Sequence, residues 1–228
     1  MAHRIVVLCL HGARQDADLF RRYCAPLIRY SPARVEFHFL DALYCDSGLD
    51  CGGEMKPMEP MEPMEPDSAD HAARAADMND EGDSRRRKRW WWPRELELDE
   101  IGRVEWTAEF ALECEPALES ISRAIEETGA SVLLGFSQGA NAAVTYMEAR
   151  QDSRIDRVVS CCGYNFLGVP SVDVPILNVI SDDDRVVPIR FTPLNFKSVR
   201  ILKHDKGHRM VTRANDARLV VDFITRQF

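Results

Sequence analysis

Residues 131–146 read S-V-L-L-G-F-S-Q-G-A-N-A-A-V-T-Y, and this stretch decides the fold. The apolar run Val132–Leu134 predicts a buried strand, and Ala140–Met147 predicts a helix rich in small residues. Between them lies a G-x-S-x-G turn centred on Ser137. A strand, this turn and a helix in that order indicate a nucleophile elbow, whose sharp turn lifts the serine hydroxyl clear of the sheet.

The residues around the serine have the properties that such an elbow requires. We expect a side chain at Gly135 or Gly139 to collide with the neighbouring strand or helix. Ser137 lies at the start of the expected helix, where unpaired N–H groups and the helix dipole favour developing negative charge. The pentapeptide alone also occurs in glycine-rich β–α turns, so its meaning depends on the rest of the chain.

The rest of the chain alternates expected strands with expected helices. Apolar runs predict strands at 4–10, 35–40, 157–160, 176–180 and 198–202. Helical spacing predicts helices at 16–30, with Asp16 as N-cap, and at about 108–127 and 213–228. The alternation predicts an α/β fold with a mostly parallel central sheet and helices on both faces, and 228 residues suffice for one such domain.

The amino-acid composition changes over about 46–89. We predict this segment to be an inserted, largely disordered loop in a single domain spanning 1–228. The triplet M-E-P repeats three times from Met58 to Pro66, and the segment is rich in charge. It ends in the basic run Arg85–Arg89, which is either a solvated charge run or a nuclear or anionic-lipid signal. A protein partner of this insertion is a further hypothesis.

Composition excludes several classes of function. The net charge of −8 argues against a general nucleic-acid binder, and no apolar stretch is long enough to span a bilayer. Seven cysteines without a C-x-x-C motif predict reduced thiols in a cytosolic protein, with Cys9 and Cys161 in the core. We find no metal-ligand spacing, P-loop or G-x-G-x-x-G motif, so the sequence predicts neither a metal nor a cofactor.

A serine nucleophile needs a base and a carboxylate, and both follow Ser137 in the expected order. An expected strand ends in Ser181 and three aspartates, of which Asp184 is favoured because D-x-V-V-P places it at the loop turn. Asp182 is the alternative, and Asp183 stays open. The later loop K-H-D-K-G-H favours His208, because Gly207 allows a close approach to the serine; His204 is the alternative. His11 is expected to be structural.

The oxyanion hole needs two backbone N–H groups. One is expected from Gln138, directly after the nucleophile, and the other from Ala13 in the loop after the first strand. The tryptophans Trp90–Trp92 cannot all be buried by one regular element, so we expect at least one to face a cleft or a cap.

Several of these segments together resemble the FSH family of serine hydrolases, which includes the ovarian-tumour candidate 2 esterase. The resemblance rests on C-L-H-G-A-R-Q-D-A-D-L-F-R, the tryptophan run, L-L-G-F-S-Q-G-A-N-A-A, S-C-C-G-Y-N-F, D-D-D-R-V-V-P and K-G-H-R-M. It implies an α/β-hydrolase that cleaves carboxylic esters or thioesters, with Ser137, Asp184 and His208 as the triad. The segment that carries the three aspartates begins with Ser181, where the family commonly has glycine. Because of this departure, the choice of the catalytic acid among the three aspartates stays open.

The leading hypothesis is therefore a cytosolic serine hydrolase that acts on a small-molecule acyl ester or thioester. By the resemblance, Trp91 and Trp92 match an aromatic segment near the substrate channel. Phe166 would add to an acyl pocket, although core packing explains it equally well. The alternatives are an acyl-protein thioesterase and a non-catalytic protein of the same fold that binds a ligand or partner.

Overall fold

A seven-stranded sheet forms the centre of the part of the chain that the computed structural model describes, namely residues 4–45, 48–49, 55–56, 88–92, 108–164, 172–187 and 196–226. Its strand order is β10-β9-β8-β7-β1-β2-β5. The strands are β1 (Ile5–Leu10), β2 (Val35–Leu40), β5 (Met55–Lys56), β7 (Val132–Phe136), β8 (Arg157–Cys161), β9 (Val172–Ser181) and β10 (Phe196–His204). All neighbouring strands are parallel except the short pair β2–β5. The predicted mostly parallel sheet is confirmed.

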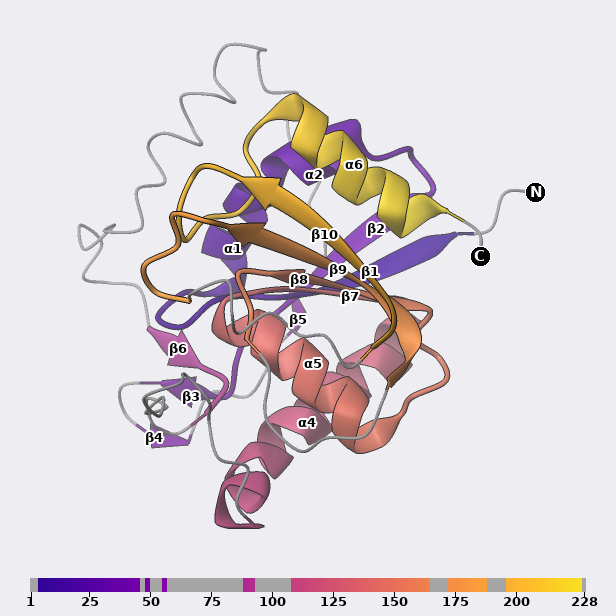
Figure 1. Ribbon diagram of the computed structural model, residues 1–228. Helices are drawn as coiled ribbons and strands as arrows, with labels where there is room; N and C mark the ends of the chain where they lie inside the picture. The colour runs from indigo at the N-terminus through magenta and orange to yellow at the C-terminus, as the bar shows by residue number, and fades with distance from the viewer. Residues whose placement is uncertain are drawn as a thin grey trace.

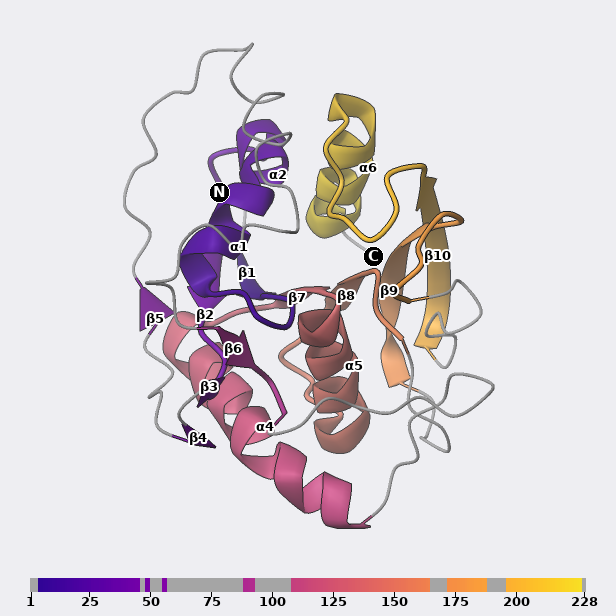
Figure 2. The same cartoon turned by 90° about the vertical axis from the view of Figure 1, so that its left-hand side faces the viewer.

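Helices cover both faces of this sheet (Figure 1). On one face lie α1 (Ala17–Tyr23), α2 (Ala25–Tyr30) and α6 (Ala214–Thr225), and on the other lie α4 (Ala108–Thr128) and α5 (Gln138–Arg150). Figure 2 shows the two groups of helices on opposite sides of the strands. Because the strands are buried on both sides, β1 and β7 consist almost entirely of apolar residues. Cys9 and Cys161 are buried in this core, as predicted. Among the described residues, no helix is both long and apolar enough to cross a membrane.

The helix predicted over 16–30 is two helices, which meet at Cys24. Pro26 explains the break, because its ring cannot continue the hydrogen-bond ladder of the preceding helix. The predicted N-cap is confirmed, since the Asp16 carboxylate accepts a hydrogen bond from the Leu19 amide at 2.7 Å.

The predicted insertion over about 46–89 lies largely outside the described residues, and its described parts include short strands near its two ends. A second, small sheet has the order β4-β3-β6, with β4 at Gly48–Leu49, β3 at Tyr44–Cys45 and β6 at Arg89–Trp90. Cys45 and Arg89 are direct cross-strand partners. The two ends of the insertion are therefore held side by side. The single domain over 1–228 stays a prediction.

Candidate active site

Four segments meet at the carboxyl edge of the parallel strands, where ligands bind in open α/β sheets. Ser137 follows β7, and residues 11–15 follow the neighbouring strand β1. The acid loop, residues 182–187, follows β9, and the histidine loop, residues 205–210, follows β10. The strand order thus gathers residues that are far apart in the sequence.

The backbone at Ser137 is sharply turned, with φ of 51° and ψ of −119°. Its amide donates to the Cys161 carbonyl at 2.9 Å, which holds the turn against β8. A Cβ at Gly135 would lie 2.3 Å from the Gly139 carbonyl oxygen, and one at Gly139 would lie 2.1 Å from the Leu10 carbonyl oxygen. The expected collisions are confirmed, so only glycine fits at either position.

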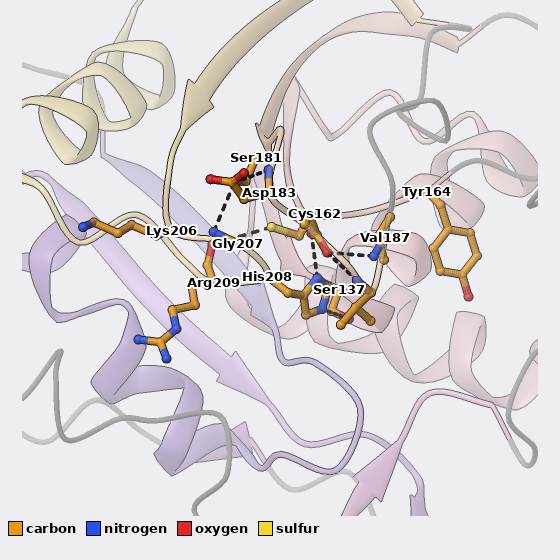
Figure 3. A network of polar contacts seen from close by, with 12 residues as sticks. Ser137, Cys162, Tyr164, Ser181, Asp183, Val187, Lys206, Gly207, His208 and Arg209 are labelled. Carbon is orange, nitrogen blue, oxygen red and sulfur yellow. Dashed lines mark hydrogen bonds and ion pairs between the residues drawn. The ribbon is translucent and has the colours of Figure 1, made fainter.

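The His208 imidazole lies between Ser137 and Asp184. Figure 3 shows His208 beside Ser137. Its Nε2 is 2.8 Å from the Ser137 hydroxyl oxygen, and its Nδ1 is 2.8 Å from Asp184 Oδ2. The Phe136 ring packs against the imidazole at 5.1 Å between centroids. The tautomer with its proton on Nδ1 donates to the carboxylate and accepts the serine hydroxyl at Nε2. This arrangement can take a proton from Ser137 and stabilise the resulting imidazolium.

Asp184 is oriented by its own loop as well as by the histidine. Its Oδ1 accepts hydrogen bonds from the Val186 and Val187 amides, both at 2.8 Å. Burial raises the pKa of the Asp184 carboxyl, but the hydrogen bonds from His208 and the two amides outweigh it, so the pKa lies below its usual value. Asp184 is therefore ionised at neutral pH.

The other aspartates and the second histidine lie away from the serine contact. Asp182 is exposed and pairs with Lys203 Nζ at 2.9 Å, and Asp183 is also exposed. His204 is buried at the end of β10, where its Nδ1 accepts a hydrogen bond from the Lys206 amide. The geometry thus separates Asp184 and His208 from the alternatives that the sequence left open.

The loop after β1 is held by a strap formed by residues 89–91. The Arg14 amide donates to the Arg89 carbonyl at 2.8 Å, and the Trp91 amide donates to Gln138 Oε1 at 2.8 Å. The Gly12 amide donates to Gln15 Oε1 and the Gln15 amide to the Gly12 carbonyl. Among the described residues, no hydrogen bond occupies the Ala13 amide.

His11 is structural, as expected. It is fully buried, its Nδ1 donates to the Gly12 carbonyl at 2.8 Å, and its Nε2 accepts from the Ala42 amide at 3.0 Å. Burial lowers the pKa of His11, which favours the neutral ring that this pattern requires. The ring therefore fixes the loop that carries Ala13.

The three aromatic residues predicted near the substrate are placed differently. Trp91 and Trp92 are fully buried. The Trp91 indole N–H donates to the His11 carbonyl at 2.8 Å, and Trp92 packs edge-on against Phe110 of α4. Trp90 is half-buried. Phe166 lies outside the described residues, and the substrate-lining role of all three stays a prediction.

Sequence reasoning missed Cys162, the residue after β8. Its backbone has a φ of 53°, its side chain is buried, and its Sγ lies 3.6 Å from the Arg209 carbonyl oxygen. Donor atoms of Cys162, Asp184 and His208 all lie within 4.8 Å of one another. Burial raises the pKa of the thiol strongly, so it stays protonated and unsuited to a metal. Cys162 follows β8, and β8 is the neighbour of β7, which leads into Ser137. This strand order is the feature that would have placed Cys162 near the serine.

Comparison with solved structures supports the fold. Acyl-protein thioesterase 2 of Zea mays aligns with a TM-score of 0.63 at 12% identity, covering 99% of this chain and 94% of that one. SOBER1 of Arabidopsis thaliana aligns with a TM-score of 0.61 at 14% identity and 97% coverage of both chains. These likenesses confirm the α/β-hydrolase fold that the family resemblance implies.

Comparison with known sequences supports the family. Esterase OVCA2 of Danio rerio is 24% identical over 242 residues, with 96% of each chain covered. Esterase GA18864 of Drosophila pseudoobscura is 21% identical and covers 98% of this chain and 72% of its own. The sequence model of the FSH1 serine hydrolases matches residues 1–217. With that match over nearly its whole length, the chain belongs to the FSH1 family of serine hydrolases.

Proposed function

We propose that this protein hydrolyses carboxylic esters or thioesters through an acyl-enzyme on Ser137. The observation that carries the proposal is the chain of two 2.8 Å contacts from Ser137 through His208 to Asp184. Family membership supports the same reaction class. We also propose a cytosolic location and a single catalytic domain.

In the first half-reaction, Ser137 Oγ attacks the acyl carbon while its proton passes to His208 Nε2. Asp184 holds the imidazole and stabilises its positive charge. The bond from the acyl carbon to the leaving oxygen or sulfur then breaks, and His208 returns its proton to the leaving group. In the second half-reaction, water attacks the acyl-enzyme and gives its proton to the same nitrogen, which releases the carboxylic acid and restores Ser137.

The tetrahedral oxyanion is stabilised by the amides of Ala13 and Gln138. The Gln138 amide lies in the first turn of α5, where N–H groups have no partner within the helix. Around Ala13, the neighbouring amides at 12, 14 and 15 are occupied by hydrogen bonds, which leaves the amide at 13 available to a ligand. Neither a cofactor nor a metal takes part in this scheme.

The test is hydrolysis of p-nitrophenyl esters and acyl thioesters of increasing chain length, alongside Ser137→Ala. We expect wild-type activity that the substitution abolishes, and fluorophosphonate labelling of the wild type alone. A preference for S-acylated peptides would instead identify an acyl-protein thioesterase. No hydrolysis and no labelling of the wild type would favour a non-catalytic binding protein and contradict the proposal.

A further inference from the structure

Ser181 is the last residue of β9, and its side chain is almost fully buried. Its hydroxyl oxygen accepts two backbone hydrogen bonds, from the Asp183 amide at 3.3 Å and from the Gly207 amide at 3.1 Å (Figure 3). Asp183 directly precedes Asp184, and Gly207 directly precedes His208. The Ser181 hydroxyl oxygen therefore contacts both the residue before Asp184 and the residue before His208.

We propose that Ser181 is a positioning residue that fixes the acid loop against the histidine loop and so sets the Asp184–His208 contact. The inference rests on the proposed function, because it concerns the same two side chains.

The hydrogen bonds of the sheet do not fix the acid loop against the histidine loop. Pairing between β9 and β10 ends at Ser181 and His204, so beyond these residues no ladder hydrogen bond joins the two loops. The histidine loop then makes a tight turn, with Gly207 at a φ of 64° and the Arg209 amide donating to the Gly207 carbonyl at 2.9 Å. His208 is at the tip of this turn, so the position of the turn determines where its imidazole lies.

The turn is held from both sides. Ser181 accepts from the residue before His208, and the Cys162 thiol donates to the carbonyl of Arg209, the residue after it. The two contacts differ in strength, because a thiol is a weak donor. The hydroxyl contact also reaches the acid loop through Asp183, so Ser181 links the two loops directly.

The test compares Ser181→Ala with a matched control, Ser160→Ala. Ser160 lies in β8, is as deeply buried as Ser181, and its hydroxyl has no hydrogen-bond partner within the described residues. Both changes remove one oxygen atom from a buried serine. We expect Ser181→Ala to lower kcat about tenfold with KM within about twofold, and Ser160→Ala to leave both within about twofold.

A double-mutant cycle with Asp184→Asn separates positioning from a general structural effect. If Ser181 acts through the Asp184–His208 contact, Ser181→Ala will cost less than about twofold once Asp184 is replaced. An equal loss in both backgrounds, or wild-type kinetics for Ser181→Ala, would overturn the inference.

A second readout needs no substrate and keeps this inference separate from the proposed function. The imidazole proton between His208 and Asp184 gives a far-downfield proton resonance when its hydrogen bond is well held. We expect that resonance in the wild type and in Ser160→Ala, and its weakening by exchange in Ser181→Ala. An unchanged resonance in Ser181→Ala would refute the positioning role, whereas absent hydrolysis by the wild type would refute only the proposed function.

Discussion

Single residues at the carboxyl edge of the sheet carry unusual backbone geometry. Ser137 and Cys162 both have positive φ without being glycine, and they lie at the ends of the adjacent strands β7 and β8. Such conformations cost about 1–3 kcal/mol each and persist only where the surroundings enforce them. At Ser137 the sharp turn is possible because Gly135 has no side chain, which lets α5 begin directly against β7.

Gly135→Ala therefore tests the elbow. The new Cβ would meet backbone atoms of Gly139 and Ala140 at 2.3–2.5 Å, and backbone cannot turn aside as a flexible side chain can. We expect the free energy of unfolding to fall by about 3 kcal/mol or more. Gly129→Ala is the control, because its Cβ meets nothing within 4 Å and only its positive φ is penalised, by about 1–2 kcal/mol. Equal losses in chemical denaturation would contradict this account.

Asp184→Asn tests the carboxylate. An amide keeps the shape of the side chain but favours the wrong imidazole tautomer, so kcat should fall about 10³- to 10⁴-fold. Asp182→Asn and Asp183→Asn are matched controls in the same loop, and their exposed side chains should leave kcat within about twofold. A large loss at Asp182 and a small one at Asp184 would reverse the assignment of the acid.

The lowered pKa of Asp184 also makes stability depend on pH. A carboxyl group whose pKa is lower in the folded than in the unfolded chain stabilises the fold above its unfolded pKa of about 3.9, and that contribution is lost as pH falls through the folded value. The wild type should therefore exceed Asp184→Asn in stability near pH 7, by a margin that shrinks below about pH 4. Urea unfolding at a series of pH values would show this, and a margin independent of pH would contradict it.

At the scale of elements, the helix that follows the histidine loop is fastened by a buried arginine. Arg157 in β8 donates through one guanidinium nitrogen to the carbonyls of Phe223, Ile224 and Arg226 at the end of α6. These carbonyls have no partner within the helix, so the arginine acts as a C-terminal cap supplied by another element. The same helix packs against α2 on that face of the sheet.

Arg157→Ala should therefore loosen α6. The change leaves buried carbonyls without their donor and removes packed side-chain carbons, so we expect the free energy of unfolding to fall by about 2–4 kcal/mol. Arg4→Ala is the control, because its ion pair with Glu36 is at the surface and worth less than about 1 kcal/mol. Thermal and urea unfolding of both variants measure the difference, and similar losses would refute the cap.

At the scale of the whole molecule, the strap of residues 89–91 joins the end of the insertion to the loop that carries Ala13. Because Cys45 and Arg89 are direct cross-strand partners, a short Gly-Asn-Gly turn in place of residues 46–88 can join β3 directly to β6. The replacement also removes the short strands β4 and β5. We expect this variant to keep kcat/KM for esters within about threefold, since the strap and its contacts with Arg14 and Gln138 remain.

A loss of all activity in that variant, with the fold intact by circular dichroism, would show that the insertion contributes to catalysis. Retained activity would show that the insertion is not needed for ester hydrolysis. Its role would then be another one, such as recruitment of a protein partner. As a control, Trp91→Ala is made in the full-length chain, with residues 46–88 left in place. We expect this variant to have a lower free energy of unfolding, because the buried indole packs beneath the loop after β1.

The sequence by itself determined the α/β class, the elbow at Ser137 and the order of the expected strands. These follow from local patterns: apolar runs at strand spacing, glycines at a tight turn, and a capping aspartate before a helix. Local patterns also misled at Cys24, where helical spacing continued across Pro26 although the proline ends the ladder there.

Only the tertiary structure decided which aspartate meets His208 and where the tryptophans lie. Asp182, Asp183 and Asp184 have the same side chain and follow one another in the chain. They differ because Asp184 is turned by two amide hydrogen bonds toward a loop 24 residues away. Burial of Trp91 likewise depends on His11, 80 residues distant in the chain. Contacts between distant segments form only when the sheet brings their ends together, so no local pattern contains them.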